Sequence, residues 1–167
     1  MEEALIMEVW DTFKQISKEP AQCLGAYVIS MTSKASDILS VYFMQKQAQT
    51  ENLLRVVPLF ETLDDLKNAK SVMENIFKLS WYRKLINHKQ EVMIGYSDSS
   101  KDAGKLSASW HQYKLQEELR NLANTLMTIN KHNKNELDYI KPDIKYINDF
   151  FQDDDEVIKV LTNNKYI

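Results

Sequence analysis

Three short apolar runs, each followed by a stretch with helical periodicity, restrict the possible fold more than any other feature of this sequence. The runs are Gly25–Met31, Leu53–Glu61 and Val92–Tyr96, and successive runs start about thirty to forty residues apart. Each run is rich in strand-forming residues with little polar alternation, which is typical of a parallel strand covered on both faces. Strands repeated at this spacing, with a helix after each, are typical of βα crossovers around a parallel sheet or barrel. We therefore predict an α/β fold.

The segments between these runs predict that the protein is rich in helix. Apolar residues recur at helical spacing in several segments, which are 2–18, 34–48, 66–77, a short piece over 81–86, and a long one from past Lys101 to about Asn130. Only three glycines and three prolines occur in the chain, which favours long helices with few flexible linkers. Beyond Asn130 the sequence becomes polar, and its scattered apolar residues predict two short helices.

Composition excludes several classes of protein. The chain has 21 basic and 24 acidic residues, for a net charge of −3, and no basic block suggests a nucleic-acid partner. Cys23 has no second cysteine with which to form a disulfide, which favours a reducing compartment. The first ten residues carry acid where a secretory signal carries Lys or Arg, and no apolar run approaches the ~18 residues of a membrane span. We expect a soluble cytoplasmic protein with no membrane contact.

Two acidic residues stand where apolar runs end. Glu61 closes the second run, and Asp98 follows the third in the stretch EVMIGYSDSSKDAG (Glu91–Gly104), which changes abruptly from apolar to polar. We expect this stretch to be a strand that ends in a reactive loop, with Lys101 on the same side. Because the carboxyl ends of parallel strands lie at one edge, the two carboxylates should stand at the same height. The alternatives are that Glu61 and Asp98 serve the starts of the following helices and that Lys101 is simply solvated.

Other polar and aromatic residues have simpler interpretations. Thr62 is a plausible N-cap, and we expect the aspartates nearby to serve helix starts; these are Asp64, Asp65 and Asp102. The three histidines have no metal-ligand spacing and are interpreted as surface or packing residues; they are His88, His111 and His132. We expect Trp110 and Tyr113 to lie in the core.

Several blocks of sequence resemble one known enzyme family. VVPLFETLDD, VMIGYSDSSKDAG and SASWHQYKLQEEL, preceded by AYVISMTSKASDILSVYFMQKQA, closely resemble phosphoenolpyruvate carboxylase and together cover about residues 5–120. Several blocks in one order are far more specific than a lone short motif. The resemblance implies a helix-rich α/β fold in which residues 1–130 form a partial (β/α) barrel of about three βα units. Residues 131–167 would be an added, divergent helical tail.

The resemblance also implies a reaction and a metal site. The family is a lyase that joins phosphoenolpyruvate and bicarbonate into oxaloacetate and releases phosphate, with Mg²⁺ or Mn²⁺ held by two carboxylates. By motif match these are Glu61 of LFET and Asp98 of GYSDS, and Lys101 corresponds to a lysine beside the metal and substrate. Hard oxygen ligands that leave the rest of the shell to water and phosphate suit Mg²⁺, so the chemistry of the residues agrees with this implication.

Parts of the family pattern do not occur in this sequence. They are an upstream histidine motif, an upstream arginine-bearing strand and a downstream FHGRGG loop, and no arginine follows Arg120. Phosphate needs several fixed positive donors, and three strands cannot close a barrel of eight. The first hypothesis is a carboxylase fragment that is inactive unless complementary chains or a homo-oligomer complete it. The second is a repurposed or decayed remnant that acts as a non-catalytic binding or structural protein. The third keeps only an α/β domain with an acidic metal site.

Overall fold

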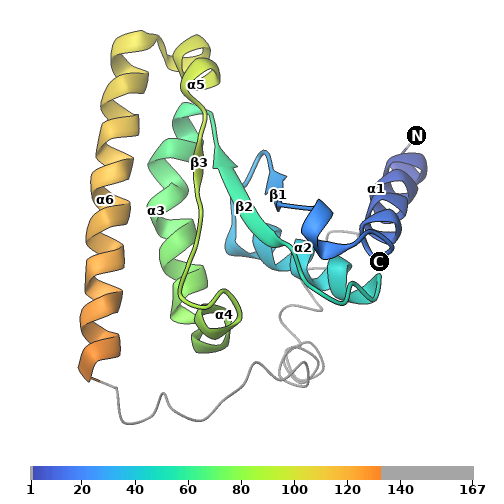
Figure 1. The fold of residues 1–167 in the computed structure, drawn as a ribbon. Coiled ribbons are helices and arrows are strands. Elements are labelled where there is room, and N and C mark those ends of the chain that lie inside the picture. The colour runs from blue at the N-terminus through green and yellow to red at the C-terminus, as the bar shows by residue number, and fades with distance from the viewer. Residues whose placement is uncertain (1, 133–167) are drawn as a thin grey trace.

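A computed structural model of the protein describes residues 2–132, and Figure 1 shows the arrangement of the elements. The two short helices predicted in the tail lie outside the described residues. The elements in chain order are α1 (Glu2–Ile16), a 3-10 turn (Ala21–Cys23), β1 (Ala26–Ile29), α2 (Ala35–Gln47), β2 (Arg55–Phe60), α3 (Leu63–Lys78), α4 (Ser80–Leu85), β3 (Met93–Ile94), α5 (Tyr96–Ala103) and α6 (Lys105–His132).

The three strands form one small parallel sheet in the order β1-β2-β3. Val28 is paired with Val57 between β1 and β2, and Phe60 is paired with Ile94 between β2 and β3. The sheet and its helices confirm the predicted helix-rich α/β class. Each strand is shorter than the apolar run that predicted it.

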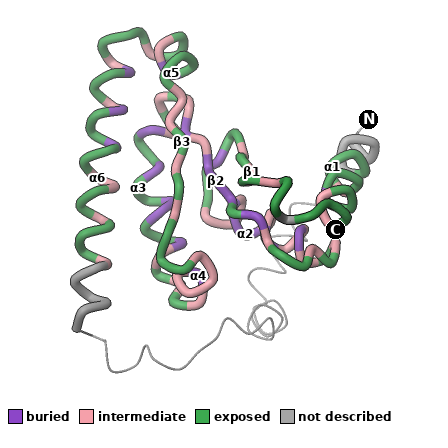
Figure 2. The backbone as a smooth tube through the Cα atoms, in the orientation of Figure 1, coloured by how far each residue is buried: buried purple, intermediate pink, exposed green. Residues whose placement is uncertain are grey.

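One face of the sheet is covered by helices and contains the core. Val56 and Phe60 of β2 are buried on this face against α2 and α3, and α6 packs against α3 on the outside (Figure 2). Tyr82 of α4 belongs to the same cluster. The buried cluster consists of Ile38, Leu39, Tyr42, Val56, Phe60, Leu66, Ala69, Val72, Met73, Ile76, Tyr82 and Leu115. The apolar spacing that predicted α2 and α3 therefore marks the residues that stabilise the fold.

The opposite face of the sheet is only partly covered. Side chains of a strand alternate between faces, so Val28, Val57, Leu59 and Met93 share one face through the strand pairing. Val28 and Met93 are each 48% exposed there. The expectation that these strands are covered on both faces is therefore wrong for β1 and β3. The physical reason is that no second layer packs on this face within residues 2–132.

The segment after β3 also differs from expectation. We predicted a reactive loop, but Tyr96–Ala103 forms the helix α5, and Tyr96 belongs to this helix rather than to the strand. The Ser99 and Ser100 hydroxyls donate hydrogen bonds to carbonyls of the preceding turn, so the polar run is compatible with a helix. Gly104, at φ 77°, ends the helix in a conformation that favours glycine and leads directly into α6.

The long helix α6 buries a different face from the one expected. Ala108, Gln112 and Leu115 face the body of the protein, whereas Trp110 and Tyr113 are 60% and 59% exposed. The prediction that these two aromatic residues lie in the core is wrong. A single helix packed against α3 and α5 on one side buries one stripe of its surface and leaves the rest to solvent. Across residues 2–132, the structure has no helix that is both long and apolar enough to cross a membrane.

Candidate functional site

Glu61 lies at the carboxyl end of β2, directly against β3. The Gly95 amide donates to the Phe60 carbonyl at 2.9 Å, which extends the strand pairing to the level of Glu61. A β-carbon placed on Gly95 would come 2.7 Å from Glu61 Cβ and 3.7 Å from Leu59 Cδ1. The Glu61 side chain therefore starts on the same, partly open face as Leu59. Only a residue without a side chain allows the two strand ends to approach this closely.

Asp98 and Lys101 belong to α5, which begins immediately after Gly95. Asp98 is in the first turn, three residues from the glycine that contacts Glu61, so the two acidic residues stand at the same end of the sheet. The Lys101 ammonium is 3.2 Å from Asp98 Oδ1, and both side chains are exposed. An exposed pair of this kind contributes about 0–1 kcal/mol, so either group is easily drawn to another partner.

Two aspartates hold the start of α3 beside the carboxyl end of the sheet that carries Glu61, Asp98 and Lys101, which we call the rim. Asp65 Oδ2 accepts the Thr62 amide at 3.0 Å, and Thr62 Oγ1 accepts the Asp65 amide at 3.1 Å, which forms a reciprocal capping box. Asp102 of α5 accepts the Leu63 amide at 2.8 Å. The prediction that Asp65 and Asp102 serve helix starts is confirmed, although Asp102 serves the start of α3 and not of its own helix. These bonds join the segment after Glu61 to the helix that carries Asp98.

A buried polar relay joins α5 to α6. Gln112 Nε2 donates to Ser99 Oγ at 2.6 Å, and Ser99 Oγ donates to the Gly95 carbonyl at 2.5 Å. Ser99 and Gln112 are both buried, so these bonds are shielded from water. The roles of Gly95, Ser99 and Gln112 do not follow from the sequence patterns above. The glycines on either side of YSDSSKDA, with acid in the first turn and lysine in the last, are a helix signal that could have revealed α5.

The chemistry available at the rim suits a hard divalent cation. Glu61 and Asp98 offer carboxylate oxygens, and within residues 2–132 the Glu61 carboxylate makes no hydrogen bond or ion pair with the protein. No group of three or more His, Cys, Asp or Glu side chains converges in the described part of the chain. An ion here would take most of its shell from water or a bound anion, as Mg²⁺ or Mn²⁺ does. The residues present fit such an ion, and the assignment of Glu61, Asp98 and Lys101 to it remains a prediction.

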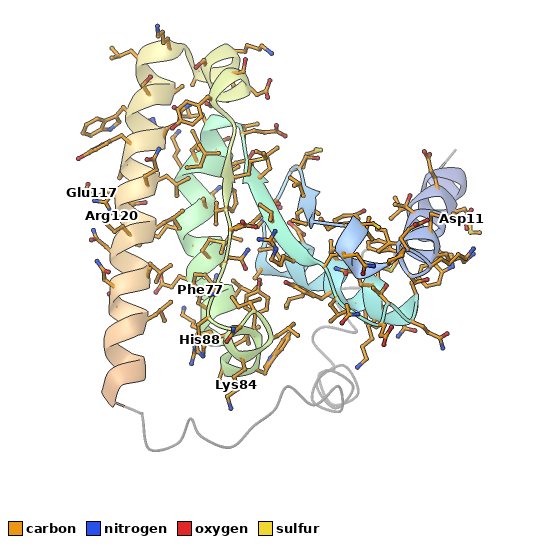
Figure 3. The ribbon with its side chains drawn as sticks, viewed as in Figure 1. Asp11, Phe77, Lys84, His88, Glu117 and Arg120 are labelled. Carbon is orange, nitrogen blue, oxygen red and sulfur yellow. The ribbon has the colours of Figure 1, made fainter. Side chains whose placement is uncertain are left out.

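The described histidine side chains and Arg120 lie away from Glu61 and Asp98. His88 is exposed between α4 and β3, near Lys84 and at the opposite end of the sheet from α5 (Figure 3). His111 is half-buried and bonds through Nδ1 to the Ser107 carbonyl of its own helix at 2.8 Å. These positions confirm the interpretation of His88 and His111 as surface or packing residues, whereas the His132 side chain lies outside the described residues. Arg120 is exposed on α6.

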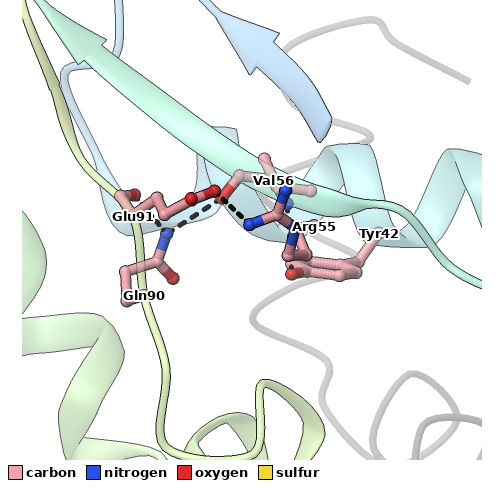
Figure 4. A network of polar contacts seen from close by, with 5 residues as sticks. All are labelled: Tyr42, Arg55, Val56, Gln90 and Glu91. Atoms are coloured by element: carbon pink, nitrogen blue, oxygen red, sulfur yellow. Dashed lines mark hydrogen bonds and ion pairs between the residues drawn. The ribbon is translucent and has the colours of Figure 1, made fainter. Parts of the chain in front are cut away.

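The amino end of the sheet carries a separate polar network with a structural role. Gln90 Nε2 donates to the Val56 carbonyl at 2.9 Å, the Val56 amide donates to Tyr42 Oη at 3.3 Å, and Arg55 pairs with Glu91 at 2.5 Å (Figure 4). Tyr82 Oη donates to Gln90 Oε1 at 2.5 Å. Burial raises the pKa of Tyr42 and, more strongly, that of Tyr82. The network fixes the segment before β3 against β2.

Comparison with known proteins points to one family. A sequence profile described as phosphoenolpyruvate carboxylase matches residues 2–129. Similar curated proteins include phosphoenolpyruvate carboxylase 3 of Arabidopsis thaliana, 55% identical over 118 residues, and that of Nicotiana tabacum, 52% identical over 118 residues. The enzyme of Actinobacillus pleuropneumoniae is 53% identical over 116 residues. These matches cover 70–71% of this chain but only 12–13% of each relative, so the chain spans about an eighth of their length.

Proposed function

Since the chain belongs to the phosphoenolpyruvate carboxylase family, we propose that it forms one section of a carboxylase barrel and supplies the metal-binding rim. The complete enzyme would convert phosphoenolpyruvate and bicarbonate into oxaloacetate and phosphate. The observation that carries the proposal is the close approach of Glu61 to Gly95, which brings the LFET and GYSDS motifs together at one end of the sheet.

The partly open sheet face supports a role as one section of a larger barrel. Val28, Leu59 and Met93 present apolar surface there, with Val28 and Met93 about half exposed. In a closed barrel such a face points inward and is filled by side chains from the other strands. We propose that complementary chains, or further copies of this chain in a homo-oligomer, cover this face.

The rim would hold Mg²⁺ or Mn²⁺ through Glu61 and Asp98. A bound divalent cation supplies positive charge next to developing negative charge on phosphate and enolate oxygens. Lys101, now paired with Asp98, would exchange that carboxylate for an anionic substrate when the cation binds. The amino ends of α3 and α5 lie at the same rim, and their dipoles favour anions.

Because of where the arginines lie, we do not expect residues 1–167 to catalyse the carboxylation by themselves. Arg55 starts β2, Arg83 donates to the Phe77 carbonyl in the α4 region, and Arg120 is exposed on α6. The first two belong to the amino end of the sheet, and the sequence has no arginine beyond these three. A phosphate-binding site relies on fixed, bidentate guanidinium donors, which one lysine does not replace. We therefore propose that the chain has no carboxylase activity by itself.

A complementation assay tests this proposal. Purified residues 1–167 are assayed for oxaloacetate with Mg²⁺ and bicarbonate, alone and with the two flanking fragments of the Arabidopsis relative that lack the matching 118 residues. We expect no turnover alone and measurable turnover in the mixture, abolished by Asp98→Ala. Turnover by the chain alone that depends on Asp98 would overturn the inactive-section proposal.

A second candidate is a non-catalytic binding or structural protein. The family match ends at residue 129, so the remaining residues are not accounted for by the carboxylase. Leu106, Trp110 and Tyr113 also form an exposed apolar surface on α6. Failure of the fragments to complement, with the chain folded and the fragments associated, would favour this candidate.

A further inference from the structure

The helix α5 carries Asp98 but is too short to be stable by itself. It has eight residues, whereas isolated helices shorter than about 12–15 residues are marginal in water. Its position relative to Glu61 must therefore be set by contacts with the rest of the protein. Three contacts do so: the Gly95 end lies against β2, one side bonds to α6, and the far end bonds to α3.

The contact with α6 is a relay with a fixed direction. A serine hydroxyl has one hydrogen to give, and Ser99 directs it at the Gly95 carbonyl at 2.5 Å while accepting from Gln112 Nε2 at 2.6 Å. Ser99 is fully buried and Gln112 is 4% exposed, so loss of the Gln112 donor cannot be made good by bulk water. The relay thus joins α6 to the glycine that touches Glu61.

The contact with α3 fixes the other end of α5. Asp102 lies one helical turn beyond Asp98, and its Oδ2 accepts the Leu63 amide at 2.8 Å. Leu63 is two residues beyond Glu61 in the chain. Asp102 therefore ties the helix that carries one acidic residue to the segment that carries the other.

We propose that Gln112 and Asp102 are positioning residues that set the separation of the Glu61 and Asp98 carboxylates, so that both can ligate one divalent cation. Neither residue touches the cation itself. Gln112 acts through Ser99 and Gly95, and Asp102 acts through the Leu63 amide. The inference rests on the proposed metal-binding function of the rim.

The test is Mn²⁺ affinity, measured by electron paramagnetic resonance on purified residues 1–167. We expect Gln112→Met and Asp102→Ala each to weaken Mn²⁺ binding about 10–100-fold, the range typical when groups that orient metal ligands are lost. Asp102→Asn keeps an oxygen that can accept the Leu63 amide, so it should retain the parent affinity. Asp102 is exposed, so its variants report on the proposal even where the buried Gln112→Met change prevents folding.

Gln116→Met is the matched control. Gln116 is one turn further along α6 and also bonds to α5, through Tyr96 Oη at 3.2 Å, but it is exposed and does not reach Gly95. It should leave Mn²⁺ affinity unchanged. Affinities are compared with unfolding midpoints in urea, because a purely structural role would change the midpoint alone.

The outcomes separate the inference from the proposed function. Parent protein that binds no Mn²⁺ overturns the metal-binding rim and this inference with it. Parent protein that binds Mn²⁺, with Gln112→Met and Asp102→Ala folded and binding equally well, overturns only the positioning role. Equal weakening by Asp102→Ala and Asp102→Asn would overturn the role of the Leu63 bond.

Discussion

The close approach of β2 and β3 at Gly95 can be tested with a single methyl group. In Gly95→Ala the added carbon would lie 2.7 Å from Glu61 Cβ and 3.1 Å from Glu61 Cα. Carbon atoms pack at about 3.5–4.0 Å, so the strand ends must separate by about 1 Å. The neighbouring atoms belong to the backbone and the base of a side chain, which cannot rotate away. The substitution therefore has to displace Glu61 from the rim.

The expected change in the free energy of unfolding of Gly95→Ala follows from two opposing effects. Overpacking costs about 1–3 kcal/mol. Gly95 has φ −80° and ψ 100°, which alanine adopts without strain. Because alanine lowers the conformational entropy of the unfolded chain, it offsets about 0.4–1 kcal/mol of this cost. We expect a net loss of up to about 2.6 kcal/mol in the free energy of unfolding. Gly25→Ala is the control, because a β-carbon on Gly25 meets nothing within 4 Å and should cost nothing.

The assay is urea denaturation followed by circular dichroism, together with Mn²⁺ titration of the folded variants. Gly95→Ala should lower the midpoint with an unchanged dependence on urea, and it should weaken Mn²⁺ binding, whereas Gly25→Ala should do neither. Equal midpoints and equal Mn²⁺ affinities for the two variants would refute the placement of Glu61 against Gly95.

Three further predictions concern the surrounding structure. Thr62→Ala removes the side-chain half of the α3 capping box and should cost about 1 kcal/mol in urea denaturation, whereas an unchanged midpoint would contradict the cap. Burial raises the pKa of Tyr82 above its unfolded value near 10, so its contribution to stability is complete below about pH 10 and is lost as pH rises further. Tyr82→Phe should therefore make the free energy of unfolding fall less steeply above pH 10. An equally steep fall in both proteins would contradict this. Trp110→Ser removes an exposed side chain and should change the unfolding free energy by less than about 0.5 kcal/mol, so a larger loss would show that Trp110 is buried in solution.

Two errors of the sequence-based prediction have a common physical cause. The apolar content of GAYVISM and VMI indicates buried strands, but burial depends on what packs against each face, and residues 2–132 provide helices on one face of the sheet only. Trp110 and Tyr113 have apolar rings on a helix with several apolar residues, and only the position of α3 and α5 determines which stripe is buried. The third error has a local cause: glycine and serines around Asp98 are typical of a loop, but the Ser99 and Ser100 hydroxyls donate to carbonyls of the preceding turn.

The sequence alone determined that three strands are each followed by a helix, the parallel α/β class, Thr62 as the N-cap of α3 with Asp65 at its start, and the family. These features depend on periodicity and on neighbouring residues, which a sequence displays directly. Only the tertiary structure decided that Glu61 meets Gly95, that Gln112 reaches Ser99, and that Asp102 caps a helix other than its own. Each of these contacts joins different elements, and its existence depends on how those elements pack.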